Sequence, residues 1–161
     1  MSSKMKFKIT STAGIAQNWL KQSRRFLDAA IACKDISEAS LSASQLAAEQ
    51  ALKACTYLTL NLPEIEEKKE LKRHFHTHNH KALLSRLPPE VITVDLQKAS
   101  AFLGGLLDRT RYPIPYSGKP PYDIFNPTRA QEGIEAAELI HQFATRYVTE
   151  VSAAISRCVT K

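Results

Sequence analysis

The sequence predicts an all-α protein, an up-and-down four-helix bundle with an additional short helix. Four long segments carry apolar residues at three- and four-residue steps, and the connections between them are short or of medium length. With 161 residues, of which 43% are hydrophobic, the chain can bury one core without a disulfide or a structural metal. We expect the bundle to occupy residues 15–157, between a polar N-terminal tail, residues 1–14, and a short tail, residues 158–161.

The first two helices are expected in the N-terminal part of the chain. The first should cover residues 15–34, where apolar positions repeat with helical spacing among charged ones. The second should open near Ser42, because Gln45 follows three residues later and completes a capping-box pattern. It should end near Asn61, ahead of Pro63, since proline interrupts helical hydrogen bonding.

A short helix and the third long helix follow. The short helix is expected over residues 80–87, with its leucines facing inward and Pro88 ending it. The third long helix is expected over residues 95–109. Near its end, Gly104 and Gly105 would allow another backbone to approach closely.

The last helix follows a loop that contains four prolines between Tyr112 and Asn126. It is expected to begin at Asn126-Pro127-Thr128, where Asn or Thr can cap the free amides and proline suits the first turn. Gln131 completes a possible capping box. Its inner face should comprise Ile134, Ala137, Ile140, Phe143, Ala144, Tyr147, Val151 and Ile155.

Charge and cysteine content restrict the class of protein. A net charge of +6 and a pI near 9.3 favour anionic partners such as nucleotides, RNA or acidic proteins. The three cysteines are odd in number and lack zinc-site spacing, which indicates reduced thiols in a cytoplasmic protein. No apolar stretch has the form of a secretory signal or the length of a bilayer span, so we expect no membrane partner.

Several segments, in their order along the chain, resemble one known family. They are Trp19 near the start of the first helix, the alanine-rich stretch from Ser44 to Ala54, the turn Thr77-His78-Asn79, and Arg111-Tyr112-Pro113 after the third helix. Together they resemble the HEPN family (higher eukaryotes and prokaryotes nucleotide-binding) over residues 17–148. Two positions depart from the family's pattern: His80 stands where Leu is usual, and Asn79 replaces Asp.

The resemblance implies a fold, a set of partners and a catalytic motif. It implies a helical domain similar to the one that closes kanamycin nucleotidyltransferases, and stand-alone relatives often occur beside a small nucleotidyltransferase. Ribonuclease members use an Arg followed four to six residues later by a His at the end of the third helix, in a metal-independent reaction. Here the segment from Arg109 to Tyr116 contains no histidine. We therefore expect a non-catalytic domain without a cofactor.

A histidine-rich run offers two further hypotheses. Arg73 and His78 have the catalytic spacing in a different place, so they are candidates for a displaced pair, although His78 also matches the family's turn histidine. Alternate histidines share one side of an extended chain and are candidate metal ligands. We favour an exposed linker with one structural histidine, because no carboxylate or cysteine in the run completes a ligand shell. The candidate metal ligands are His74, His76, His78 and His80.

Candidate ligand-binding residues surround the end of the third helix: Arg109, Arg111, Tyr116, Lys119 and His78. Cations there can hold a phosphate, and an aromatic face can stack a base. We expect Arg111 to be mainly structural. Arg109, on the helix, should face a dimer cleft and contribute about 1 to 3 kcal/mol to anion binding. Tyr112 and Phe125 should instead cover the open end of the bundle.

These observations favour a nucleotide- or RNA-binding module without catalytic activity. The alternatives are a partner subunit of a minimal nucleotidyltransferase in a toxin-antitoxin or defence system, and a metal-independent endoribonuclease toxin. A homodimer is expected, because family members associate through helical faces. The features that support it are Gly104, Gly105, Val148, Val151 and Ile155.

Overall fold

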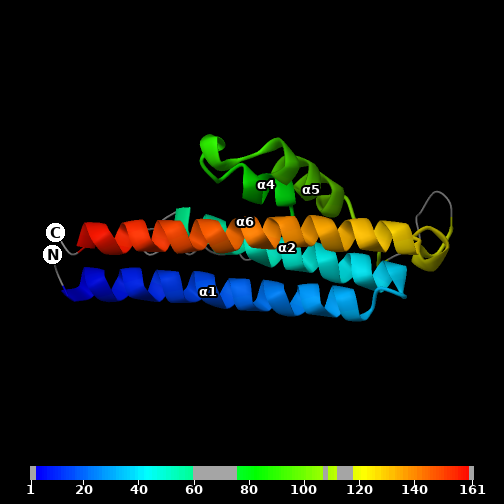
Figure 1. Cartoon of the computed structure of the whole chain (residues 1–161), viewed down its shortest axis with the longest axis horizontal. Coiled ribbons are helices and arrows are strands. Elements are labelled where there is room, and N and C mark those ends of the chain that lie inside the picture. The colour runs from blue at the N-terminus through cyan, green and yellow to red at the C-terminus, as the bar shows by residue number, and fades with distance from the viewer. Residues whose placement is uncertain (1–2, 60–75, 107–108, 112–117, 160–161) are drawn as a thin grey trace.

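Three long helices run side by side, and two shorter helices pack beside them (Figure 1). In this computed structural model α1 spans Ser3–Ala32, α2 spans Ser37–Thr59 and α6 spans Pro127–Val159. The structure describes residues 3–59, 76–106, 109–111 and 118–159. Every helix and turn of this described part belongs to an all-α fold, as the sequence predicted. No helix within these ranges combines the length and apolarity needed to cross a membrane.

The second long helix forms the centre of the bundle. It packs against α1 on one side and α6 on the other, and most of its side chains are buried. Alanines permit this close packing, because a short side chain lets neighbouring helices approach. The fully buried ones are Ala47, Ala48, Ala51 and Ala54.

The shorter helices form a separate pair on this core. α4 spans His80–Leu84, and α5 spans Val94–Gly104. Both begin with a side-chain cap: Oδ1 of Asn79 accepts from the Ala82 amide at 3.0 Å, and Oγ1 of Thr93 accepts from the Leu96 amide at 3.1 Å. α4 contacts α2 and α5, while α5 contacts α6. Single 3₁₀ turns, Pro89–Val91 and Pro121–Asp123, lie in the described parts of two connections. The leucines predicted to face inward are buried: Leu83, Leu84 and Leu87.

Several predicted helix ends differ from the observed ones, among them the end of α4, which is Leu84 and not Leu87. α1 begins at Ser3, so most of the predicted tail has a helical backbone. α2 begins at Ser37, so Ser42 and Gln45 lie inside the helix and do not form a capping box. α5 ends at Gly104, which leaves the fourth helix of the bundle much shorter than the others. Two consecutive glycines explain this early end, since glycine is a poor helix former.

The last helix agrees with its prediction except in one capping contact. Oδ1 of Asn126 accepts from the Arg129 amide at 2.9 Å, and Pro127 is the first helical residue. Nε2 of Gln131 donates to Glu135 at 3.0 Å, so the predicted capping box is wrong. The predicted inner face is confirmed: Ile134, Ala137, Ile140, Ala144 and Tyr147 are buried, and Phe143, Val151 and Ile155 are half-buried.

The cap of α6 provides a test of this assignment. Asn126→Ala should lower the free energy of unfolding by about 1 kcal/mol, because the Arg129 amide loses its acceptor. Thr128→Ala should change it by less than about 0.5 kcal/mol, since Thr128 is exposed and lies inside the first turn. Urea unfolding of both variants measures the difference. A larger loss for Thr128→Ala would show that the cap is assigned to the wrong residue.

Candidate functional site

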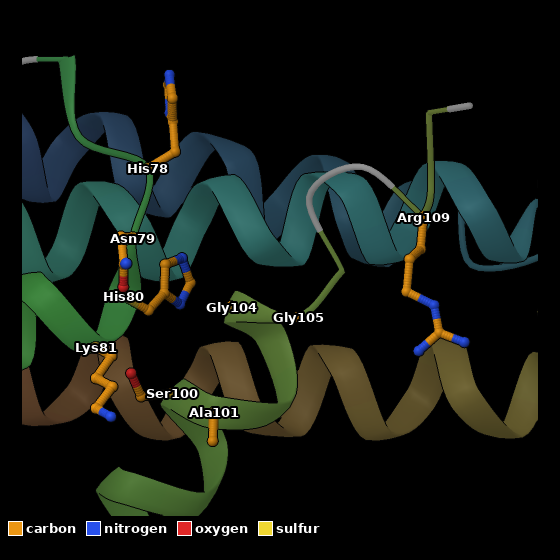
Figure 2. Close-up of a pocket in the computed structure, with 9 residues that line it drawn as sticks. All are labelled: His78, Asn79, His80, Lys81, Ser100, Ala101, Gly104, Gly105 and Arg109. Atoms are coloured by element: carbon orange, nitrogen blue, oxygen red, sulfur yellow. The ribbon is translucent and has the colours of Figure 1, made fainter. Parts of the chain in front are cut away.

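A groove of about 700 Å³ opens where the start of α4 meets the end of α5 (Figure 2). Its described lining contains basic and neutral polar side chains and no carboxylate. Two of the lining residues, Lys81 and Arg109, are cationic at neutral pH, and two are histidines, His78 and His80. The complete lining is His78, Asn79, His80, Lys81, Ser100, Ala101, Gly104, Gly105 and Arg109.

His80 forms part of the groove floor and is almost completely buried, with 1% of its surface exposed. A Cβ on Gly104 would lie 3.1 Å from the Cβ of His80, so the absence of a side chain there makes room for the imidazole. The close approach predicted at this glycine is therefore made by a side chain of the same chain. The predicted exposed linker is wrong at His80, because this histidine packs between α2 and α5.

Beneath the groove, α2 carries a stripe of three buried polar side chains at four-residue steps. Nζ of Lys53 donates to Oε1 of Glu49 at 2.7 Å, and both side chains are 2% exposed. Nε2 of Gln45 donates to Oε2 of Glu49 at 3.2 Å. The Lys53 ammonium also lies 5.5 Å from the ring centroid of Trp19, a distance typical of a cation–π contact.

His78 completes the contacts of the Glu49 carboxylate. Its Nδ1 lies 3.0 Å from Oε2 of Glu49, while about half of its side chain is exposed. Burial alone would raise the pKa of Glu49, but the hydrogen bonds from Lys53 and His78 outweigh it and hold that pKa below its ordinary value. Glu49 is thus an ionised acceptor at neutral pH. The turn histidine ties the segment before α4 to α2.

The same network determines where His80 carries its proton. Nε2 of Gln45 faces both the Glu49 carboxylate and Nε2 of His80, which is 3.3 Å away. The carboxylate accepts only from a donor, so this amide atom is the NH₂ group and His80 Nε2 must accept. Burial lowers the pKa of His80 to about 4, against the opposing effect of the Glu49 charge. The ring is therefore neutral at pH 7, with its proton on Nδ1.

The two candidate arginines lie in surroundings that differ from the predicted ones. Arg109 is exposed and lines the groove, but it lies in a turn beyond α5 and not on the helix itself. Arg111 is exposed and makes no hydrogen bond or ion pair with another described residue, so the expected structural contacts are not found there. Lys119 is exposed and does not line the groove. Tyr116, like Tyr112, lies outside the described residues.

The histidine run does not form a metal site within the described residues. No group of three histidine, cysteine or carboxylate side chains in this part of the chain is arranged to hold a metal ion. His76 is exposed, as an exposed linker requires. His74 and Arg73 lie outside the described residues, so the displaced catalytic pair of Arg73 and His78 stays a prediction.

The groove does not bring the side chains of His78 and Arg109 together. Figure 2 shows the side chains of His78 and Arg109 projecting in different directions. Arg109 also lines a second crevice of about 150 Å³, with Phe125 and Arg129 among its walls. Phe125 packs against the core, as predicted, and the guanidinium of Arg129 lies 5.0 Å from the ring centroid of Phe102.

A serine–histidine contact elsewhere is unsuited to nucleophilic catalysis. Oγ of Ser23 donates to the Ala47 carbonyl at 2.8 Å and contacts Nδ1 of His141 at 2.9 Å. Because the hydroxyl proton is engaged with the carbonyl, the imidazole must donate to the serine. His141 therefore cannot remove the proton that a nucleophilic serine would have to lose.

Two features that supported a homodimer are used within the chain. Val148 is fully buried in the chain's own core, and Gly104 packs on His80. Val151 and Ile155 are half-buried, which leaves part of each side chain open to solvent. The homodimer stays a prediction.

Sequence reasoning missed the polar stripe beneath the groove. Its signal is present: Gln45, Glu49 and Lys53 recur every four residues in a helix whose other positions are mostly apolar. Such a stripe on a buried helix predicts side chains that bond to one another, since unpaired buried charges are very costly.

The ion pair can be tested by an isosteric change. Glu49→Gln should lower the free energy of unfolding by about 3 to 5 kcal/mol, because it leaves the buried Lys53 ammonium without its carboxylate. Glu135→Gln, at an exposed position of α6, should change it by less than about 0.5 kcal/mol. Urea unfolding checks both. Equal stability of Glu49→Gln and the parent would contradict the role given to the pair.

Acid should destabilise the protein in two stages. Because the pKa of His80 is about 4 when folded and about 6.5 when unfolded, the unfolded state binds more protons between these values, so stability falls as pH drops from about 6.5 to about 4. The lowered pKa of Glu49 extends the loss of stability to pH values below about 4.5.

Melting temperatures measured against pH test this prediction. In His80→Leu, the melting temperature should fall less steeply between about pH 6.5 and about pH 4 than in the parent. His76→Ala, which removes an exposed imidazole, should follow the parent curve. A smaller residual slope is expected from His141, whose pKa burial also lowers.

Comparisons with known proteins agree with this architecture. The crystal structure of TT1696 from Thermus thermophilus matches with a TM-score of 0.67 and 27% identity, covering 82% of this chain and 97% of that one. ST0689, an archaeal HEPN homologue, matches with a TM-score of 0.62 and 24% identity, covering 83% and 97%. No curated protein matches the sequence. The model of the HEPN domain family matches residues 16–147, and the chain therefore belongs to the HEPN domain family.

Proposed function

We propose that this chain is a nucleotide- or RNA-binding module without catalytic activity, and that the groove between α4 and α5 is its binding site. One observation carries the proposal: Lys81 and Arg109 line a groove whose described lining contains no carboxylate. A phosphate there meets positive charge without a competing negative group. The volume of about 700 Å³ lies in the range of small-ligand sites.

Arg109 is the main candidate for the phosphate contact. It is exposed, and it makes no hydrogen bond or ion pair with another described residue. A guanidinium presents several donors in one plane and suits two phosphate oxygens at once. The net charge of +6 adds a general attraction for polyanions. Membership of a family named for nucleotide binding supports the same ligand class.

The sequence between Arg109 and Tyr116 argues for binding over ribonuclease activity. It contains no histidine that could take a proton from a ribose hydroxyl. In the groove, the imidazole of His78 and the guanidinium of Arg109 diverge, so they do not supply a replacement pair (Figure 2). A partner subunit of a nucleotidyltransferase stays the alternative, and it would use the same domain without the groove.

The two arginines form a matched pair for the test. Arg109→Ala should weaken binding of uridine monophosphate and of ribose 5-phosphate by about tenfold, because a charge-assisted hydrogen bond is lost. Arg111→Ala removes the same charge two residues away, outside the groove lining, and should bind as the parent does. Isothermal titration calorimetry at two salt concentrations provides the measurement.

Two outcomes would change the assignment. If Arg111→Ala loses binding while Arg109→Ala retains it, the anion site lies beyond the end of the groove. If neither variant nor the parent binds ribose 5-phosphate, the groove is not a phosphate site and the proposed function fails.

A further inference from the structure

Two polar atoms at the floor of the groove have no hydrogen-bond partner in the described part of the chain: Nδ1 of His80 and Oγ of Ser100. Both residues line the groove, and they are 1% and 2% exposed. Backbone contacts with Ser100 and Gln45 both raise the pKa of His80, but neither carbonyl forms a hydrogen bond with Nδ1 in this structure. Buried polar groups are nearly always bonded, so two unpaired ones in one groove point to a missing acceptor.

Both atoms can act as donors toward the same place. The contact with Gln45 leaves the His80 proton on Nδ1, and the Ser100 hydroxyl is free to rotate. Ser100 and Gly104 lie one turn apart on α5 and therefore share a face. Nδ1 of His80 is 3.8 Å from the position that a Cβ on Gly104 would take. Figure 2 shows the ring and the hydroxyl on the side of α5 that faces α4.

We infer that His80 and Ser100 form a subsite for the carbonyl oxygen of a nucleobase, belonging to a nucleotide whose phosphate contacts the exposed cations of the same groove. This inference rests on the proposed function. A carbonyl oxygen has two lone pairs and can accept from both donors at once. A phosphate oxygen suits the floor less, because burying its charge among neutral groups costs far more than leaving it beside exposed Lys81 and Arg109.

The subsite predicts which bases are preferred. Uracil and guanine carry ring carbonyls, whereas adenine offers only ring nitrogens with one lone pair each. Adenine would therefore leave one of the two donors unpaired. Discrimination of this kind depends on a lost hydrogen bond at a buried donor, and it is usually large for that reason.

Access to the floor requires a small movement of the end of α5. In this structure each of the two atoms exposes less than 1 Å² to solvent. Gly104 packs directly on His80 and ends the helix, and the next amide, that of Gly105, makes a long hydrogen bond of 3.3 Å to Ala101. Helix ends are the least stable parts of a helix, and local shifts on ligand binding are common.

Ser100→Ala is the decisive variant, because it separates a ligand-binding role from a structural one. The hydroxyl has no partner within the described residues, so its removal should leave the melting temperature unchanged or slightly raised. The parent should bind uridine monophosphate about tenfold more tightly than adenosine monophosphate, and Ser100→Ala should bind both equally. Ser44→Ala is the matched control. The Ser44 hydroxyl is also buried and has no hydrogen-bond partner among the described residues, but Ser44 does not line the groove.

His80→Leu is the second variant, since leucine fills the buried space without a donor. It should also abolish the preference for uridine monophosphate. Isothermal titration with the two nucleotides and with ribose 5-phosphate distinguishes the outcomes. If the parent binds ribose 5-phosphate but treats the two bases alike, or if Ser100→Ala keeps the preference, the subsite is refuted and the proposed function stands. If the parent binds none of the three, both are refuted.

Discussion

The Glu49 carboxylate is the group on which the arrangement around the groove depends. It is buried on the central helix, where an unpaired charge would be very costly, so each of its oxygens must be supplied with donors. Lys53 and Gln45 supply them from the same helix, and His78 supplies one from the segment before α4. Without the contact from His78, no described hydrogen bond would join this segment to the carboxylate.

The Glu49 carboxylate also determines which ring nitrogen of His80 carries the proton. Glu49 orients the Gln45 amide, the amide fixes the protonated nitrogen of His80, and that nitrogen faces the end of α5. A charge that never meets solvent thereby determines which hydrogen-bond donor lies at the floor of the groove. The effect passes through two hydrogen bonds and needs no change in backbone structure.

The helical class and the inner faces of the helices were predictable from the sequence, whereas several helix ends were not. Periodicity reports which face is buried, so the inner face of α6 was identified correctly, and its cap is Asn126, one of the two residues that the sequence offered. It contains less information about where a helix starts, and Ser42 looked like a cap although α2 already begins at Ser37. A local pattern such as a capping box competes with tertiary packing, and here packing prevailed.

The groove was only partly predictable. Arg109 and His78 were candidates from the sequence, but Ser100 and the buried state of His80 were not, because both depend on how α4 meets α5. A histidine among exposed histidines gives no sign of burial. Only the glycine opposite, Gly104, indicated that something would approach closely there, and its partner is a residue distant in sequence.

The fluorescence of Trp19 can be used to follow the surroundings of the buried ion pair. Trp19 is the chain's one tryptophan, and the Lys53 ammonium lies over its indole ring. Indole emission responds to nearby charge, so tryptophan fluorescence, excited where tyrosine absorbs little, reports on the surroundings of this one side chain. An event that moves Trp19 on α1 away from Lys53 on α2 should change this signal without an added dye.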